Sequence, residues 1–168
     1  MLCPGSSINE HKEKILNSAS NGDTMVISVN FIPDFVTPDC VFCANTKRLN
    51  NISNVEDVSK IITSNLLESV ENDYDFAFSF NNCVYFNEEF CEDSTLMLLK
   101  VLSNCGCRDV YLAGFDGFAS GKNNYYSECY TKEKGKNVTI DVVRGIITTA
   151  LDKLQLHFVT PSLYEDKK

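Results

Sequence analysis

The feature that most constrains this chain is an alternation of short, β-rich apolar runs with stretches of helical periodicity. The runs with strand character are TMVISVNF (24–31), CVFCAN (40–45), KIITS (60–64), DYDFAFSF (73–80), RDVYLAGFDGF (108–118) and LHFVT (156–160). Most of them are almost wholly apolar, as strands buried on both faces are. Strands that alternate with helices predict an α/β fold: a three-layer, Rossmann-like, mostly parallel open sheet with helices on both faces.

Three stretches carry the helical patterns, and they cover 8–22, 92–106 and 139–155. The second is the clearest, because Asp93 or Ser94 can cap its start and Gly106 can end it. The third places Ile140, Val143, Ile147, Ala150, Leu151 and Leu154 on one face. We therefore expect amphipathic helices that cover the sheet.

Length and composition favour a single domain. The chain has 168 residues, 43% of them hydrophobic, which suffices for one ordinary core. It contains no repeat or composition shift, so the prediction is one Rossmann-like domain over 1–168. Within it, 119–137 is expected to be a long polar loop and 165–168 a polar tail.

The charge balance argues against two classes of partner. The chain has 23 acidic and 15 basic residues, a formal net charge of −8, and such a surface repels nucleic acid and anionic membranes. No apolar run approaches the roughly 18 residues that span a bilayer, and the start lacks the pattern of a signal peptide. We expect a cytoplasmic protein that binds neither nucleic acid nor membrane.

Eight cysteines raise the question of disulfides or a metal. Cys40 and Cys43 form a C-x-x-C, but within a strand their thiols would point to opposite faces, which does not suit a zinc ion. The chain has only two histidines. The expectation is reduced thiols and no metal site, with Cys40, Cys43 and Cys105 largely buried.

Polar and glycine residues follow the predicted strands, starting with PGSS at 4–7 after a short apolar opening. In a parallel sheet all these strand ends lie at one edge, where ligands bind. The candidate ligand-binding residues are Gly5, Ser6, Ser7, Asn30, Asn45, Gly114 and Asp116. Glycine admits a phosphate, serine hydroxyls donate to it, and asparagine can contact a base or sugar. Taken singly, each is also an ordinary turn or helix cap.

The order PGSS, VISVNF, VFCANTKRL, RDVYLAGFDGF and FVTPSLY resembles the Rossmann-like C-terminal domain of some bacterial aldolase-like proteins. Those proteins carry a barrel like that of 4-hydroxy-2-oxovalerate aldolase or HMG-CoA lyase and occur in surface-polysaccharide settings. More distantly, the strand ends look like those of bacterial sialyltransferases that use CMP-sialic acid and of pterin-pyrophosphokinase-like domains. The resemblance implies that the seven candidate residues surround a nucleotide.

One departure from the sialyltransferases concerns catalysis. They carry a histidine, as general base, in the region that corresponds to 119–137, where this chain has none. His11 and His157 are not expected to reach the strand ends, which leaves Asp116 and Glu128 as weak candidates. The loop lysines, Lys122, Lys132, Lys134 and Lys136, either close over a phosphate or form a solvated face.

Three functions follow from these observations. The first is a binding module for a nucleotide or nucleotide-activated sugar, a small phosphate-bearing ligand, that works beside an aldolase-like barrel. This chain has no room for that barrel, which needs roughly 250 residues. The second is a small glycosyltransferase. The third is a non-catalytic interaction domain that docks a partner through a sheet edge. The strand-end residues favour the first over the third, and the absent histidine favours it over the second.

Overall fold

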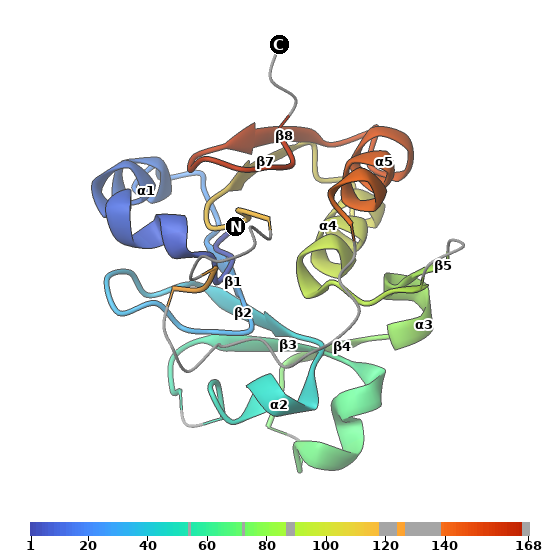
Figure 1. Cartoon of the computed structure of the whole chain (residues 1–168). Coiled ribbons are helices and arrows are strands. Elements are labelled where there is room, and N and C mark those ends of the chain that lie inside the picture. Colours follow the sequence, from blue (N-terminus) through green and yellow to red (C-terminus); the bar gives the residue numbers. More distant parts are fainter. Residues whose placement is uncertain (54, 72, 87–89, 118–123, 127–138, 166–168) are drawn as a thin grey trace.

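A computed structural model describes residues 1–168 apart from 54, 72, 87–89, 118–123, 127–138 and 166–168. It confirms the predicted class, an α/β fold with a parallel sheet covered by helices on both faces (Figure 1). Four strands pair in parallel in their order along the chain: β1 (Ile27–Val29), β2 (Cys40–Cys43), β3 (Ser59–Thr63) and β4 (Phe76–Phe78). A second parallel pair is formed by β7 (Asp109–Leu112) and β8 (Gln155–Phe158).

Residues 1–3 join these two parts into one sheet. The Leu2 N–H donates to the Ile27 carbonyl (2.8 Å), and the Cys3 N–H donates to the Ala113 carbonyl (2.8 Å). Leu2 makes parallel bridges to Ser28 and to Ala113. The strand order is therefore β4, β3, β2, β1, residues 1–3, β7 and β8. Residues 1–3 therefore form a short central strand of the sheet.

Helices occupy both faces of this sheet. Figure 1 shows α4 (Ser94–Asn104) and α5 (Ile140–Ala150) together on one side, and α1 (Lys12–Ala19) and α2 (Thr46–Leu49) on the other. The first side also carries α3 (Phe80–Cys83), and the second carries the 3-10 helices η1 (Ser6–Glu10) and η2 (Ser64–Ser69). A short antiparallel hairpin, β5 (Tyr85–Phe86) with β6 (Phe90–Cys91), leads into α4.

The side-chain alternation of β2 shows how the two faces are filled. Phe42 is fully buried in the core formed with α4, β7 and α5. Its neighbours Val41 and Cys43 point the other way, into the core formed with α2, β3 and η2. Cys40 packs on the Phe42 side, so the two thiols of the C-x-x-C do lie on opposite faces.

Several expected boundaries are corrected. The helix expected over 8–22 is broken at His11, whose backbone is not helical, so a 3-10 turn precedes α1. The strand expected over 73–80 is only Phe76–Phe78: the carboxylates of Asp73 and Asp75 before it bind Lys60, and α3 begins at Phe80 after it. The third helix ends at Ala150.

The expected burial of the cysteines holds only in part. Cys43 is buried, Cys40 is partly buried, and Cys105 is exposed, because it lies at the carboxyl end of α4 where the chain turns into solvent. The cysteines whose side chains the structure describes are free thiols: Cys3, Cys40, Cys43, Cys83, Cys105 and Cys107. None of the helices in those ranges is long and apolar enough to cross a membrane.

Candidate functional site

The expected convergence of the strand-end residues is confirmed by the parallel pairing. Gly5 follows residues 1–3, Asn30 follows β1, Asn45 follows β2, and Gly114 follows β7, so all stand at the carboxyl ends of neighbouring parallel strands. We call residues 4–7, Asn30, Asn45 and 114–117 the carboxyl-end rim. The order of strands reverses between residues 1–3 and β7, which is where open α/β sheets commonly bind ligands.

Two glycine loops meet at this reversal point. The Gly5 N–H donates to the Gly114 carbonyl at 2.9 Å. A Cβ on Gly5 would lie 2.3 Å from that carbonyl oxygen, and one on Gly114 would lie 2.0 Å from the Cys3 carbonyl oxygen. Gly114 also has φ +73°, a left-handed conformation that other residues rarely adopt. Both positions therefore require glycine for the close approach of the loops.

Asp116 binds the serine loop directly. Its Oδ2 accepts from the Ser7 N–H (2.8 Å) and its Oδ1 from the Ser7 hydroxyl (2.5 Å). The Ser7 hydroxyl also contacts Thr160 Oγ1 (2.8 Å), which accepts from the Gly114 N–H (2.9 Å). The two Ser7 donors expected to hold a phosphate are thus occupied by a carboxylate of the same chain.

The environment of Asp116 shifts its protonation. Burial raises the pKa of this carboxyl, while hydrogen bonds from Ser7 and Ser6 and the charge of His11 act to lower it. His11, which was not expected to reach the strand ends, follows the 3-10 turn Ser6–Glu10, and its effect on the pKa of Asp116 is the smallest of these contributions.

Asn30 combines a left-handed backbone conformation with a buried side-chain oxygen that has no partner among the described residues. It adopts φ +65°, and its N–H donates to the Phe42 carbonyl (2.8 Å). Its side-chain Oδ1 is buried and has no hydrogen-bond partner among the residues that the structure describes. Asn45, by contrast, caps α2, because its Oδ1 accepts from the Lys47 N–H (2.9 Å). The rim thus leaves one buried oxygen unused.

Sequence reasoning missed the part of the polar loop that lies on the rim. Tyr125 makes an antiparallel bridge to Gly5, and the Tyr126 N–H donates to the Pro4 carbonyl (2.8 Å). The Arg48 guanidinium lies 5.9 Å from the centre of the Tyr125 ring. Two adjacent tyrosines in a polar stretch were the only available signal. They bring an aromatic ring and a cation to the rim.

His157 and Asp93 occupy opposite ends of the sheet. His157 Nε2 lies 2.9 Å from Asp109 Oδ1 at the start of β7, away from the rim, as expected. Asp93 was expected only as a helix cap, and it accepts from the Thr95 and Leu96 N–H groups. Burial raises the pKa of Asp93. Burial is also the main cause of the raised pKa of Tyr125, which the charge of Arg48 lowers and the charge of Asp93 raises by smaller amounts. Asp93 is therefore a second acidic group near the rim.

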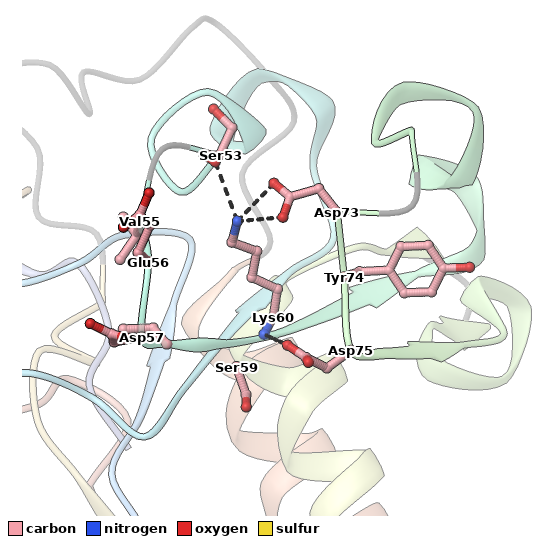
Figure 2. A pocket seen from close by; sticks show the side chains of 10 residues that line it. Ser53, Val55, Glu56, Asp57, Ser59, Lys60, Asp73, Tyr74 and Asp75 are labelled. Atoms are coloured by element: carbon pink, nitrogen blue, oxygen red, sulfur yellow. Dashed lines mark hydrogen bonds and ion pairs between the residues drawn. The ribbon is translucent and has the colours of Figure 1, made fainter.

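A hollow in the surface lies at the edge of the sheet formed by β3 and β4 (Figure 2). Its volume is about 930 Å³, and its lining residues, which we call the acidic hollow, are Ser53, 55–60 and 73–75. Lys60 Nζ binds both carboxylate oxygens of Asp73 at 2.7 Å and the Ser53 carbonyl at 3.2 Å. The hollow sits at the amino ends of β3 and β4, so it is separate from the rim.

The remaining candidates lie outside the described residues. These are Glu128 and the loop lysines Lys122, Lys132, Lys134 and Lys136. Across the described ranges, no three His, Cys, Asp or Glu side chains gather in a way that could hold a metal ion. Comparison with known proteins finds no match: no family model fits the chain, and no curated protein or solved structure is similar to it. The function must therefore be inferred from the rim itself.

Proposed function

We propose that this chain is a binding module that holds a nucleotide or a nucleotide-activated sugar at the carboxyl-end rim. The observation that carries the proposal is the unpartnered Asn30 oxygen beside the point where the strand order reverses. A buried acceptor without a partner is costly, and an amino group of a base or a sugar hydroxyl would satisfy it. The resemblance to aldolase-associated domains adds a role beside an aldolase-like barrel in bacterial surface-polysaccharide synthesis.

The other rim groups suit the remaining parts of such a ligand. The Tyr125 ring offers a flat apolar surface on which a base can stack, and Arg48 beside it supplies the positive charge that a phosphate needs. The loop at 4–7 fits phosphate less well while Asp116 is ionised, because carboxylate and phosphate would compete for Ser7. We therefore place the phosphate near Arg48 and the base or sugar near Asn30.

A thermal-shift titration tests this proposal. The purified chain is titrated with CMP, UMP and GDP and with their sugar conjugates. A ligand that binds only the folded state raises the melting temperature as its concentration rises. At a ligand concentration of 100 times Kd, it adds about 2.7 kcal/mol to the free energy of unfolding. Asn30→Gly keeps the left-handed backbone but removes the side chain, and Arg48→Gln removes the charge. We expect each to weaken binding about tenfold.

Lys14→Gln is the matched control for Arg48→Gln, since Lys14 is an exposed cation on α1. It should bind like the unmodified chain. If no compound shifts the melting temperature at millimolar concentration, or if both rim variants bind normally, the proposed rim site is wrong.

The raised pKa of Asp116 favours a second candidate, a small glycosyltransferase. A partly buried carboxyl with a raised pKa is a candidate general base for an acceptor hydroxyl. Its two hydrogen bonds to Ser7 equally suit a positioning role. Nucleotide release from CMP-, UDP- and GDP-sugars, with and without acceptor glycans, separates the two. Turnover that is abolished in Asp116→Asn would favour the enzyme, and absence of turnover favours the binding module.

A further inference from the structure

The open edge of the sheet at β4 is a second feature that could bind another molecule. Within the part of the chain that the structure describes, β4 pairs only with β3. The Asp75 N–H donates to the Lys60 carbonyl (2.9 Å), so by the alternation of a parallel ladder Phe76 and Phe78 direct their N–H and C=O groups outward. Such a row of outward groups is a template for a further strand.

The two faces of this edge have different chemistry. Phe76 stands opposite Ile61, on the face of the sheet that carries α4, and 58% of its surface is exposed. Lys60 points to the other face, where the acidic hollow opens, and Asp75 lies beside it with its Oδ2 accepting from the Lys60 backbone N–H (Figure 2). A strand added beside β4 would alternate its side chains between these two faces. One set would meet an exposed aromatic ring and the other the hollow.

The charges of the hollow define the side chains that fit it. Its lining holds the carboxylates of Glu56, Asp57, Asp73 and Asp75 and the single amine of Lys60. Lys60 is already bound by Asp73, so it offers no free positive charge to an incoming group. Lysine and arginine side chains would therefore be attracted, whereas a second copy of a chain with net charge −8 would be repelled.

We propose that the β4 edge binds an extended segment of a partner protein in which basic residues alternate with apolar ones. The segment adds to the sheet as a further strand through the outward groups of Phe76 and Phe78. Its basic side chains enter the acidic hollow, and its apolar side chains cover Phe76. Backbone hydrogen bonds supply the affinity, and the alternating side chains supply the specificity.

The probe for this proposal is a labelled hexapeptide, Lys-Val-Arg-Val-Lys-Val, titrated against the full chain by fluorescence anisotropy. We expect saturable binding that weakens with salt, and no binding of Glu-Val-Glu-Val-Glu-Val. Two further copies are N-methylated, one on the valines and one on the basic residues. Only one set of alternate amides faces β4, so the two copies should differ about tenfold in affinity.

Variants of the chain locate the site. Phe76→Pro removes an outward N–H without touching the bonds to β3 and should abolish binding. Glu56→Lys reverses an exposed charge in the hollow and should weaken binding about fivefold. Glu13→Lys, an exposed charge reversal on α1, is the matched control and should change nothing. Should Phe76→Pro fail to fold, Glu56→Lys and the methylated peptides still decide the question.

Two results would overturn the proposal. In the first result, the peptide binds Glu56→Lys and Glu13→Lys with equal affinity, and the two methylated peptides bind the chain with equal affinity. Binding would then be a nonspecific attraction to an acidic protein. The second is a chain that sediments as a dimer, becomes a monomer in Phe76→Pro, and stays a dimer when the peptide is added. That result would assign the edge to a second copy of the chain.

Discussion

At the scale of single residues, Asp116 illustrates how one side chain changes the interpretation of a loop. The sequence at 4–7 has the glycine and hydroxyls of a phosphate loop, yet its Ser7 donors bind the Asp116 carboxylate. Asp116 therefore links the loop that follows β7 to the loop that follows residues 1–3. The same contacts make the loop less receptive to anions while Asp116 is charged.

Removing the Asp116 side chain should destabilise the protein. Asp116→Ala leaves the Ser7 N–H and hydroxyl without their partner, and we expect a loss of about 2 kcal/mol in urea unfolding at neutral pH. Asp116→Asn keeps an acceptor for Ser7 and should cost less than half as much. Equal losses in the two variants would mean that charge, and not the hydrogen bonds, stabilises this contact.

The pH dependence follows from the raised pKa of Asp116. Folding favours the protonated carboxyl, so the folded state binds more protons than the unfolded state between the ordinary pKa of 3.8 and the raised folded value. Stability from this group is greatest below that window and falls as the pH rises through it. Asp116→Asn lacks this contribution, so its melting temperature should decline less between about pH 4 and pH 7 than that of the unmodified protein. Parallel pH profiles for both proteins would contradict this.

At the scale of elements, α4 is the helix whose start is most clearly set by one residue. The Asp93 carboxylate, one of the two caps that the sequence offered, accepts from the Thr95 and Leu96 N–H groups, and Cys105 ends the helix next to Gly106. Residues 95–99 and Val101 are all buried, so the first turns of α4 are enclosed on every side and the burial pattern marks no single face. Local sequence therefore determined the limits of α4, whereas its orientation came from tertiary packing.

The cap of α4 gives a second test. Asp93→Ala should lower the free energy of unfolding by about 1 kcal/mol, because two helix N–H groups lose their acceptor. Asp93→Asn should stay within a few tenths of a kcal/mol of the unmodified protein, since asparagine caps equally well and burial already disfavours the charge. Chemical unfolding measures both. An Asn variant as unstable as the Ala variant would assign the effect to charge.

At the scale of the whole molecule, residues 1–3 connect the two halves of the sheet. They bond to β1 on one side and to the end of β7 on the other, and the glycine contact above them tolerates no side chain. The folded sheet thus depends on a segment at the very start of the described chain. A change that separates the two loops should affect the entire protein.

Gly114→Ala tests this dependence. Its Cβ would lie 2.0 Å from a backbone oxygen in a left-handed conformation, and we expect a loss of at least about 3 kcal/mol. Gly22→Ala is the control, because nothing lies within 4 Å of its Cβ position, and it should stay within about 0.5 kcal/mol. Thermal unfolding compares the two. If they are equally stable, the loops do not require the close contact.

The sequence by itself determined the α/β class, the mostly parallel direction of the apolar strands and the common edge at which their polar ends lie. These follow from local periodicity and from the geometry of parallel strands, so they need no knowledge of long-range contacts. Even the short opening strand followed from residues 1–3 and the Pro-Gly turn after them. The ligand assigned to that edge stays a prediction.

Only the tertiary structure decided which of these polar residues meet. Asp116 and Ser7 are 109 positions apart, and Tyr125 bridges back to Gly5 across a similar distance in sequence. The acidic hollow around Lys60 also arises from a tertiary contact, the ion pair of Lys60 with Asp73. The physical reason is that side-chain partners are chosen by the packing of strands and helices against one another. Periodicity within a short window carries no information about that choice.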